Sequence, residues 1–524
     1  MKHFNVTFRL DGRQISIHAN ATLLEAAGQA GIILNSVCGG KGTCKKCLIN
    51  LESYNKQVLA CQHHIDSDLT VTIPTTSRFY EQKILAHGID VEAIIPRKPP
   101  APAAQTFGLA VDIGTTTVVA KLIDIATGRC TATAATLNPQ ARHGDDVISR
   151  IAYAQTDPKL AELQKLIIDC INELIADLSS KASIDTSQIH QACIVGNTTM
   201  NHIFLKLPIT SLGRAPYNAY SLDANDLPAK QLSLEISPDA NVHTVENIAG
   251  FVGSDTTAVA LAVDIDSAEE MMLVVDIGTN GELVLGTADK LYAASCAAGP
   301  ALEGARITCG SRAVAGAIEA VFVNDDDIDV DVIGSQPPRS ICGSGLVDAV
   351  AVLLDLGIID ATGRFVESEK LSRRLPLAIL PRIIEQDGQP AFVITDQTSA
   401  GGQRVLLTQK DIREVQLAKA AIRAGTKLLQ QKLNLTDDDI KQILLAGAFG
   451  NYIRRESAVR IGLLPDIPVE RIRFVGNAAS SGAQMILLSG QYREQARQLA
   501  RKIEYVEVAH EEDFESVFAD AMAF

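Results

Sequence analysis

Hydrophobic and polar residues alternate near the start of the chain and then change to a helical spacing. The segments "FNVTFRL" and "RQISIHA" alternate around "DGR", which is typical of a β-hairpin over 4–19. The segment "TLLEAAGQAG" over 22–31 has helical spacing, with Thr22 placed to cap the helix and Glu25 three residues later. A further strand, "LTVTIP", follows at 69–74. Hairpin, helix, loop and strand in this order predict a small β-grasp domain.

Two longer segments share another pattern, in which an apolar strand leads into a polar turn and a second strand. The first is "GLAVDIGTTTVVAKLIDIATG" and the second is "MLVVDIGTNGELVLGTADK", so that Asp112 aligns with Asp276, 164 positions later. An internal repeat of this kind predicts a duplicated α/β domain in which each half presents one turn toward a shared cleft. We place the two halves at 106–268 and 269–524.

Four cysteines in the N-terminal part have the spacing of metal ligands, C-x5-C-x2-C and a fourth after thirteen more residues: Cys38, Cys44, Cys47 and Cys61. Four thiolates are what a [2Fe–2S] cluster needs, and the glycines between them allow backbone N–H groups to approach the cluster sulfurs. Zinc also takes four cysteines, but usually through two short C-x2-4-C pairs, of which this stretch has one. We therefore predict a ferredoxin-like [2Fe–2S] domain at 1–79, with zinc as the alternative.

The remaining candidate ligands favour structural interpretations. His63 and His64 follow the last cysteine and suggest Rieske ligation, but four cysteines already fill the site, so we interpret them as a solvated surface pair. Six other cysteines have no ligand spacing, and we expect small buried apolar side chains, with a second metal site at the last three as the alternative: Cys130, Cys170, Cys193, Cys296, Cys309 and Cys342.

Composition identifies a linker and argues against a nucleic-acid-binding protein or a membrane protein. Residues 80–105 end in the run "PPAPAA", which favours a semi-rigid polyproline II linker between the cluster domain and the rest. The chain of 524 residues has 47% hydrophobic residues and a net charge of −15, without the basic stripe of a nucleic-acid-binding protein. No apolar run reaches the roughly 18 residues of a transmembrane helix, so we expect a cytoplasmic protein.

The repeated turns contain the groups that bind phosphate. Glycine at the bend allows backbone N–H groups to approach an anion, threonine hydroxyls add donors, and aspartate can hold Mg²⁺ directly or through water. A third apolar strand runs into the loop of "IKQILLAGAFGNYI", where Gly447 and Gly450 would let an adenine ring or ribose lie against the backbone. Glycines and small polar groups also occur at strand-to-helix turns in "CIVGNTTMNHIF", "ICGSGLVD" and "FVGNAASSGAQMIL". For the last of these we favour a packing turn.

These motifs resemble those of the ASKHA superfamily, the fold of actin, sugar kinases and Hsp70. "DIGTTT" and "DIGTNGE" would be the phosphate motifs and "LAGAFGN" the adenosine motif. Taken with "CGGKGTCKKC", "NPQARHGDDVISRI" and "CGSGLVD", the sequence is similar to the reductive activators of corrinoid proteins, which join an N-terminal [2Fe–2S] domain to an ATP-binding ASKHA domain.

This resemblance implies a function and roles for individual residues. The chain would use ATP and Mg²⁺ to transfer an electron from an upstream low-potential reductant, through the cluster, to an inactive Co(II) corrinoid protein of a methyltransferase system, and would form a homodimer. Asp112 and Asp276 would handle Mg²⁺ and the attacking water. Asp146 is a weaker catalytic candidate, since it also suits the N-cap of the following helix. The nucleotide would be held by Gly114, Thr115, Thr116, Gly278, Thr279, Asn280, Gly281, Gly447 and Gly450.

Other functions fit parts of the pattern. A redox-sensing ATP-binding module would gate a partner without delivering electrons, and an ATP-driven donor could serve a different low-potential enzyme. Activators of 2-hydroxyacyl-CoA dehydratases also join an ASKHA ATPase to a cluster, but there a [4Fe–4S] cluster bridges two subunits. A small-molecule kinase would have no evident use for a ferredoxin domain.

Overall fold

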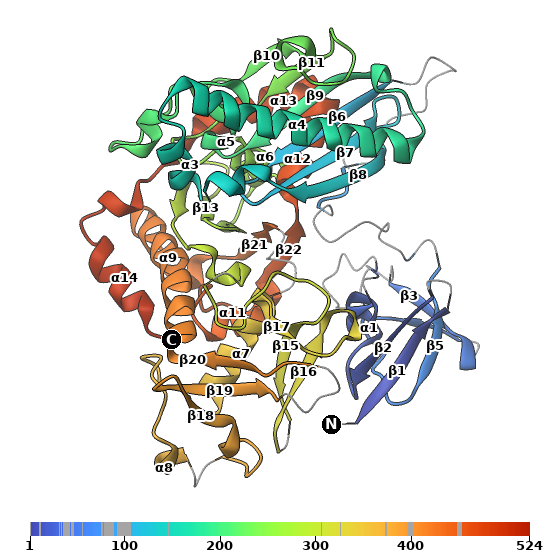
Figure 1. The fold of residues 1–524 in the computed structure, drawn as a ribbon, viewed down its shortest axis with the longest axis vertical. Coiled ribbons are helices and arrows are strands. Elements are labelled where there is room, and N and C mark those ends of the chain that lie inside the picture. The colour runs from blue at the N-terminus through green and yellow to red at the C-terminus, as the bar shows by residue number, and fades with distance from the viewer. Residues whose placement is uncertain are drawn as a thin grey trace.

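The structure is a computed structural model, in which an N-terminal domain lies beside two larger lobes (Figure 1). It describes all residues except 1, 10–11, 31, 33, 35–41, 43–46, 55, 75–76, 78–87, 92–105, 145, 305, 325, 372–374, 397–401 and 448–452.

The N-terminal domain is a five-stranded mixed sheet with one helix against it. Its elements are β1 (His3–Phe8), β2 (Arg13–His18), α1 (Leu23–Gln29), β3 (Leu48–Leu51), β4 (Lys56–Leu59) and β5 (Leu69–Thr72). The strand order is β2-β1-β5-β3-β4, in which β1 and β5 are parallel, and this confirms the β-grasp prediction. The backbone N–H of Thr22 donates to Glu25 and that of Glu25 donates to the Thr22 hydroxyl, so the predicted cap of α1 is present.

Two six-stranded sheets share a five-stranded topology, as the internal repeat predicted. The first, in order β10-β11-β9-β6-β7-β8, contains β6 (Phe107–Ile113), β7 (Thr117–Asp124), β8 (Cys130–Leu137), β9 (Ile189–Gly196), β10 (Asn225–Pro228) and β11 (Asn241–Thr244). The second, in order β22-β21-β12-β13-β14-β23, contains β12 (Met272–Ile277), β13 (Gly281–Gly286), β14 (Leu291–Cys296), β21 (Gln442–Ala446), β22 (Ile472–Gly476) and β23 (Ile503–Tyr505). In each sheet an antiparallel meander carries two added strands parallel to its first strand. The sheets differ in the sixth strand, which is added beyond β11 in the first sheet and beyond β14 in the second.

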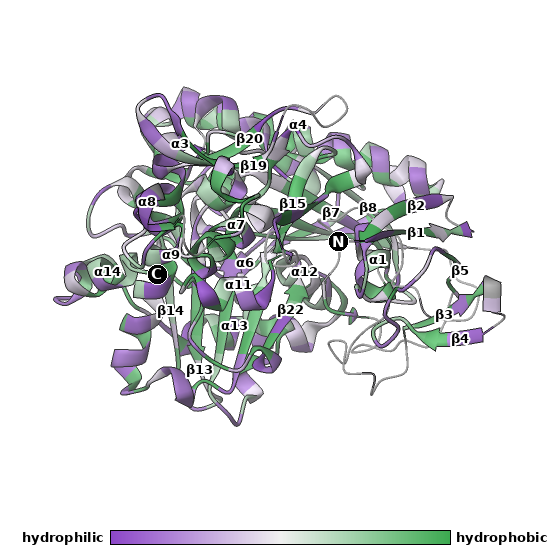
Figure 2. Ribbon diagram, turned by 90° about the horizontal axis from the view of Figure 1, so that it is seen from below, coloured by the Kyte–Doolittle hydropathy of each residue, from purple (hydrophilic) through white to green (hydrophobic). Residues whose placement is uncertain are grey.

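Helices cover both sheets and join the lobes. The first half of the repeat contains α3 (Val147–Tyr153), α4 (Asp157–Ala182), α5 (Thr198–Leu205) and α6 (Ser254–Ala262). The second half contains α7 (Gly343–Asp355), α8 (Ser368–Leu371), α9 (Gln409–Leu433), α11 (Arg455–Arg460), α12 (Ala478–Leu488), α13 (Gly490–Lys502) and α14 (Phe514–Met522). Of these, α12 packs against β6 and β9 of the first sheet, and α12 and α13 both pack against α6 (Figure 1). A cross-lobe core lies around α6 and α12 and includes Ala110 and Val195 of one sheet with Val274 and Leu444 of the other. In Figure 2 hydrophobic residues follow interior strands such as β13 and β14, and hydrophilic residues concentrate at the periphery.

Residues 88–91 belong to the predicted linker but pack against the cross-lobe core. Val91 is buried there, and the Ser481 hydroxyl of α12 donates to the carbonyl oxygen of Ile89 at 3.3 Å. Composition did not reveal this contact, because the apolar side chains responsible are few and isolated. The rest of 80–105 lies outside the described residues.

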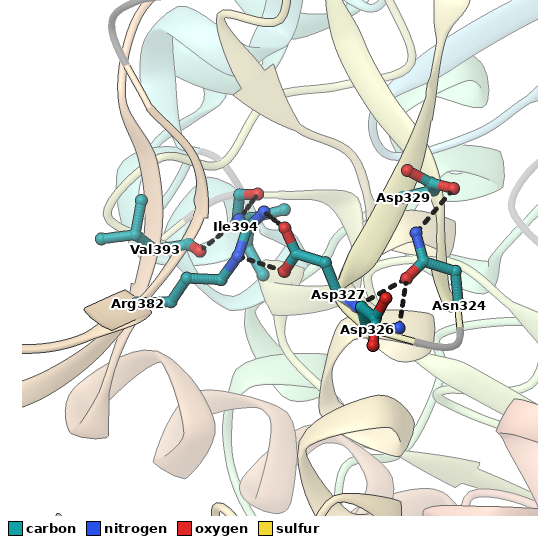
Figure 3. A network of polar contacts seen from close by, with 7 residues as sticks. All are labelled: Asn324, Asp326, Asp327, Asp329, Arg382, Val393 and Ile394. Carbon is teal, nitrogen blue, oxygen red and sulfur yellow. Dashed lines mark hydrogen bonds and ion pairs between the residues drawn. The ribbon is translucent and has the colours of Figure 1, made fainter. Parts of the chain in front are cut away.

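Two small sheets are inserted in the second lobe, and a polar network joins them. One contains β15 (Ala317–Val323), β16 (Ile328–Val332) and β17 (Ser340–Ile341); the other contains β18 (Ile383–Gln386), β19 (Gln389–Thr395) and β20 (Val405–Thr408). Arg382 forms a bidentate ion pair with Asp327, both bonds being 2.6 Å, and also donates to the carbonyl oxygens of Val393 and Ile394 (Figure 3). Asn324 closes the hairpin turn by accepting from the backbone N–H of Asp327 at 2.6 Å. The β15–β16 hairpin is therefore fixed at its tip.

The N-terminal domain docks on this hairpin, beside which it lies in Figure 1. The His18 ring meets the Phe322 ring edge-on, with the two ring centroids 4.9 Å apart. The Arg454 guanidinium also lies over the Phe322 ring, 5.0 Å from its centroid. The Gln29 amide, at the end of α1, donates to the Asp331 carboxylate of β16. These contacts attach the domain to the second lobe.

Replacing Phe322 by alanine should loosen this docking. The aromatic pair and the cation–π contact together contribute about 1–2 kcal/mol, so the undocked fraction should rise roughly 5- to 30-fold. Distances between spin labels on the N-terminal domain and the second lobe would measure the shift. Phe474→Ala is the matched control because Phe474 is exposed on β22. An unchanged distance distribution in Phe322→Ala would contradict the contact.

A buried histidine of the first lobe makes stability depend on pH. His243 on β11 contacts the Asp226 carboxylate at 3.2 Å, and Arg493 of α13 contacts the same oxygen. Burial, and then the Arg493 charge, lower the pKa of His243 to about 4. Between about pH 6.5 and 4 the unfolded chain therefore binds a proton that the folded chain does not, and stability falls as pH falls. We expect the first lobe to lose about 2 kcal/mol between pH 7 and 5 in urea unfolding, and His243→Gln to remove most of this loss.

Candidate active site: a nucleotide cleft and a thiol pair

The two predicted phosphate turns face each other across the lobes. Asp112 lies near the end of β6 and Asp276 near the end of β12. In each turn the glycine N–H bonds back to a carbonyl, from Gly114 to Thr117 at 2.9 Å and from Gly278 to Asn280 at 2.9 Å. The hydroxyl oxygens of Thr116 and Thr279 are 3.1 Å apart, so the two turns are in direct contact.

A cavity of about 540 Å³ opens between these turns, a volume that suits a nucleotide. The predicted residues that line it are Asp112, Gly114, Thr115, Thr116, Asp276, Gly278, Thr279, Asn280 and Gly447. Gly281 is not among the lining residues; a Cβ there would lie 2.8 Å from Ile422 of α9, so this glycine permits close packing. Gly450 lies outside the described residues.

Gly447 has a positive φ of 86°, and a Cβ at this position would lie 2.4 Å from an Asp276 oxygen. Only glycine lets the loop after β21 pass so close to the carboxylate. This position supports the adenosine-motif prediction by bringing the loop to the same cavity as the two phosphate turns.

Four carboxyl groups lie together at the base of the cavity. Loss of surrounding water, followed by the charges of Asp255 and Asp276, raises the pKa of Asp112 to about 7; desolvation and Asp255 likewise raise that of Asp276 to about 7. Desolvation raises the pKa of Asp255 to about 6 and that of Glu282 well above its usual value. Such a group of mutually repelling carboxylates favours a divalent cation.

The described residues contain no group of three His, Cys, Asp or Glu side chains placed to bind one metal ion by themselves. Mg²⁺ usually keeps several waters and is held by one or two carboxylates together with substrate phosphates. Asp112 and Asp276 fit that role, with phosphate and water completing the coordination.

The motif "NPQARHGDDVISRI" supports the first phosphate turn from behind. Arg150 is fully buried and donates to the carbonyl oxygen of Thr115 at 2.6 Å and to Gln140 at 3.2 Å. The Asn138 amide donates to the carbonyl oxygen of Gly114 at 2.8 Å. The sequence alone does not reveal these roles, because the contacts join segments 24 and 35 residues apart.

Asp146 uses its carboxylate as a helix cap, accepting from the backbone N–H of Ser149 at 2.7 Å, and it does not line the cavity. The cap interpretation accounts for this residue. The segment "FVGNAASSGAQMIL", for which we favoured a packing turn, has two functions. Gly482 inside α12 permits close packing, since a Cβ there would lie 2.1 Å from the Ala258 carbonyl oxygen of α6. Asn477, in the turn before α12, lines the cavity and donates to Asp112 at 3.2 Å.

Further cavity residues carried weak sequence signals. Asn197 and Gly343 follow strand ends in the turns already noted, but Asp255, Glu303 and Arg312 lie in stretches without a recognised motif. Glu303 contacts both turns, since its carboxylate accepts from the Thr279 hydroxyl at 2.6 Å and from Thr116 at 3.4 Å.

Two of the four predicted cluster ligands are described, and they form a pair. The sulfurs of Cys47 and Cys61 are 3.4 Å apart, and both residues are buried. Tetrahedral thiolate coordination with bonds of about 2.3 Å separates ligand sulfurs by roughly 3.8 Å, so this pair fits a shared metal. Cys38 and Cys44 lie outside the described residues.

The surroundings of Cys61 also suit a cluster. Burial, and then the neighbouring Cys47 thiol, raise the pKa of Cys61 to about 11, whereas N–H groups of Gln62 and Gly42 directed at its sulfur act in the opposite sense. A metal would deprotonate such a thiol outright.

The other candidate ligands lie elsewhere or have other partners. His64 forms a hydrogen bond with the Asn20 carbonyl oxygen at 2.7 Å. Of the six other cysteines, four are buried, as predicted, and Cys130 and Cys309 are partly exposed.

Comparison with known proteins decides the family. Models described as a 2Fe–2S iron–sulfur cluster binding domain, as the RACo middle region, and as the C-terminal ASKHA domain of RACo match residues 4–76, 107–268 and 270–524. The corrinoid activation enzyme RamQ of Eubacterium limosum is 35% identical over 97% of this chain and 97% of that protein. The chain belongs to the RACo family of corrinoid activation enzymes.

Two other RACo-like proteins extend the comparison. The [Co(II) methylated amine-specific corrinoid protein] reductase of Methanosarcina barkeri is 24% identical and covers 80% of this chain and 77% of its own. A solved structure of a reductive activator for corrinoid, iron–sulfur protein is 31% identical, with a TM-score of 0.74 over 99% of this chain and 98% of that one. The resemblance inferred from the sequence is confirmed. In the part of this RACo family member that the structure describes, none of the helices is long and apolar enough to cross a membrane.

Proposed function

We propose that this chain uses ATP to drive one electron from an N-terminal [2Fe–2S] cluster to the cobalt of a corrinoid protein, returning inactive Co(II) to Co(I). The observation that carries the proposal is the full-length similarity to a corrinoid activation enzyme in a chain that has both a paired-thiol domain and a two-turn nucleotide cleft. When bound, the cluster supplies a one-electron couple of low potential, near −400 mV for plant-type clusters.

In this proposal the residues of the cleft bind MgATP. Asp112 and Asp276 hold Mg²⁺ and order the attacking water, and the Thr115 hydroxyl and the backbone N–H groups of the turns that contain Thr116 and Thr279 hold phosphate. Thr115 supports this role because its hydroxyl oxygen accepts from Asn197 at 2.9 Å, which leaves its proton for a phosphate oxygen. A homodimer, a cytoplasmic location and the domain boundaries remain predictions.

The nucleotide cavity is connected to the docked N-terminal domain through β15. The Ser344 hydroxyl, from the cavity-lining start of α7, donates to the Glu319 carbonyl oxygen of β15 at 2.8 Å, and the same strand carries Phe322. Arg454 lies on Phe322 and is 4.0 Å from Asp348 of α7. A nucleotide-dependent shift of α7 would therefore bias docking of the cluster domain.

The test uses reconstituted protein, a Co(II) corrinoid protein and a strong reductant, with Co(I) absorbance followed under four conditions: MgATP, MgADP, a non-hydrolysable analogue and no nucleotide. We expect Co(I) with MgATP and none without nucleotide; the analogue distinguishes binding from hydrolysis as the driving step. If Co(I) never forms while the cluster is reduced and ATP is bound, the activator function is wrong and a redox-sensing module becomes the better account.

A further inference from the structure

Glu303 lies where both phosphate turns and two cavities meet. Its carboxylate accepts from the hydroxyls of Thr279 and Thr116, which belong to different lobes. Both threonines also line a second cavity of about 310 Å³, and Arg150 and Arg312 form part of its wall. Glu303 lines both cavities, and among the described residues that line the second it alone carries a carboxylate.

The backbone holds Glu303 firmly in this place. It ends a one-turn 3₁₀ helix, Pro300–Glu303, whose Leu302 is 1% exposed in the core of the second lobe. Gly299 and Gly304 flank the turn with φ of 73° and 81°, and a Cβ on Gly304 would lie 2.2 Å from the Ser311 carbonyl oxygen. A side chain positioned so rigidly between two ligand turns is suited to contact a reacting group.

We propose that Glu303 is the proton acceptor for the water that attacks the γ-phosphate of ATP. The inference rests on the proposed ATPase function and adds a catalytic residue to it. The water oxygen forms a bond to the γ-phosphorus, the bond from that phosphorus to the β,γ-bridging oxygen breaks, and the leaving electron pair goes to ADP. One proton of the water passes to Glu303 and then through the second cavity to solvent.

The other carboxylates of the cleft are less suited to this step. Asp112 and Asp276 belong to the group at the base of the cavity, where a bound Mg²⁺ would neutralise them and weaken them as bases. Glu303 is not part of that group and lies beside the two phosphate turns, whose Thr116 and Thr279 hydroxyls donate to it. The second cavity gives water a path to Glu303, and Arg312 in its wall suits departing phosphate.

The experiment measures single-turnover cleavage of MgATP and nucleotide affinity in the full chain. Glu303→Gln keeps the size of the side chain and one acceptor oxygen for the Thr279 hydroxyl but cannot accept the proton, so we expect cleavage to fall about 100-fold or more while affinity changes less than about threefold. Glu303→Ala should regain part of its rate with added formate, which fits the second cavity. Glu512→Gln, an exposed position near the C-terminus, should cleave at the wild-type rate.

Different failures have different meanings. Cleavage by Glu303→Gln at the wild-type rate would overturn the role of Glu303 and leave the ATPase function standing. Equal losses of affinity and cleavage, without formate rescue of Glu303→Ala, would show that Glu303 only fixes the turns. A wild-type chain that cleaves no MgATP with its corrinoid partner present would overturn the proposed ATPase function and this inference with it.

Discussion

Replacement of Cys61 by serine is expected to abolish Co(I) formation while MgATP binding stays within about threefold of wild type. The sulfur of Cys61 is 3.4 Å from that of Cys47, and a cluster held by four thiolates loses a ligand from this pair in the variant. The fall in Co(I) formation should exceed about 100-fold, because even the loss of an outer partner of a metal ligand costs 10- to 100-fold. Iron content, the visible spectrum of the cluster and Co(I) absorbance measure the result.

Cys130→Ser is the matched control for this variant. Cys130 is a partly exposed thiol of the first lobe whose sulfur bonds Ala132 and Thr133, and a serine hydroxyl can keep these bonds. It should retain cluster and activity. A Cys61→Ser protein that still assembles the cluster and forms Co(I) would show that Cys61 is not a ligand.

Asp276→Asn should lower MgATP hydrolysis about 100- to 1000-fold and at the same time stabilise the nucleotide-free protein. The carboxylate would hold Mg²⁺ at the developing phosphate charge, and loss of one such electrostatic contact has this effect on rate. The amide keeps the shape of the side chain, so the loss should appear in hydrolysis and in Mg²⁺ dependence. Hydrolysis at varied Mg²⁺ concentration measures both.

The stability gain follows from the sign of the pKa shift. Burial raises the pKa of Asp276 to about 7, so the unfolded chain ionises this group from about pH 4 upward while the folded chain resists ionisation. The folded state is therefore penalised progressively between about pH 4 and 7, the penalty keeps its full size above pH 7, and the neutral amide removes it. At pH 8 we expect the unfolding temperature to rise by about 2 °C or more. Asp289→Asn, at an exposed position, is the control; full hydrolysis in Asp276→Asn would contradict the assigned role.

The features that the sequence predicted well are those that depend on a local pattern of apolar, polar and capping residues. Alternation around 4–19 and the Thr22 cap identified the β-grasp domain, and the repeat of Asp112 at Asp276 identified two equivalent strands whose turns share one cavity. Strands of this kind are buried on both faces and read as continuous apolar runs, so they are recognisable without knowledge of their neighbours.

Features that the sequence did not reveal depend on contacts between distant segments. Arg150 reads as a surface residue of an ordinary helix, yet its guanidinium is buried behind the first phosphate turn. Glu303 stands among small and apolar residues, and its importance follows only from meeting Thr116 and Thr279 across the lobes. The docking of His18 on Phe322 likewise joins residues 304 positions apart, for which no periodicity exists.

The central claim is that ATP couples to an electron leaving this chain's own cluster. The most direct test mixes the protein, with its cluster reduced and excess reductant removed, with a Co(II) corrinoid protein in a stopped-flow instrument. Cluster oxidation and Co(I) formation should then proceed at the same rate with MgATP, in equal amounts, and neither should occur without it. Co(I) formed equally without nucleotide, or MgATP hydrolysed while the cluster stays reduced, would contradict the account.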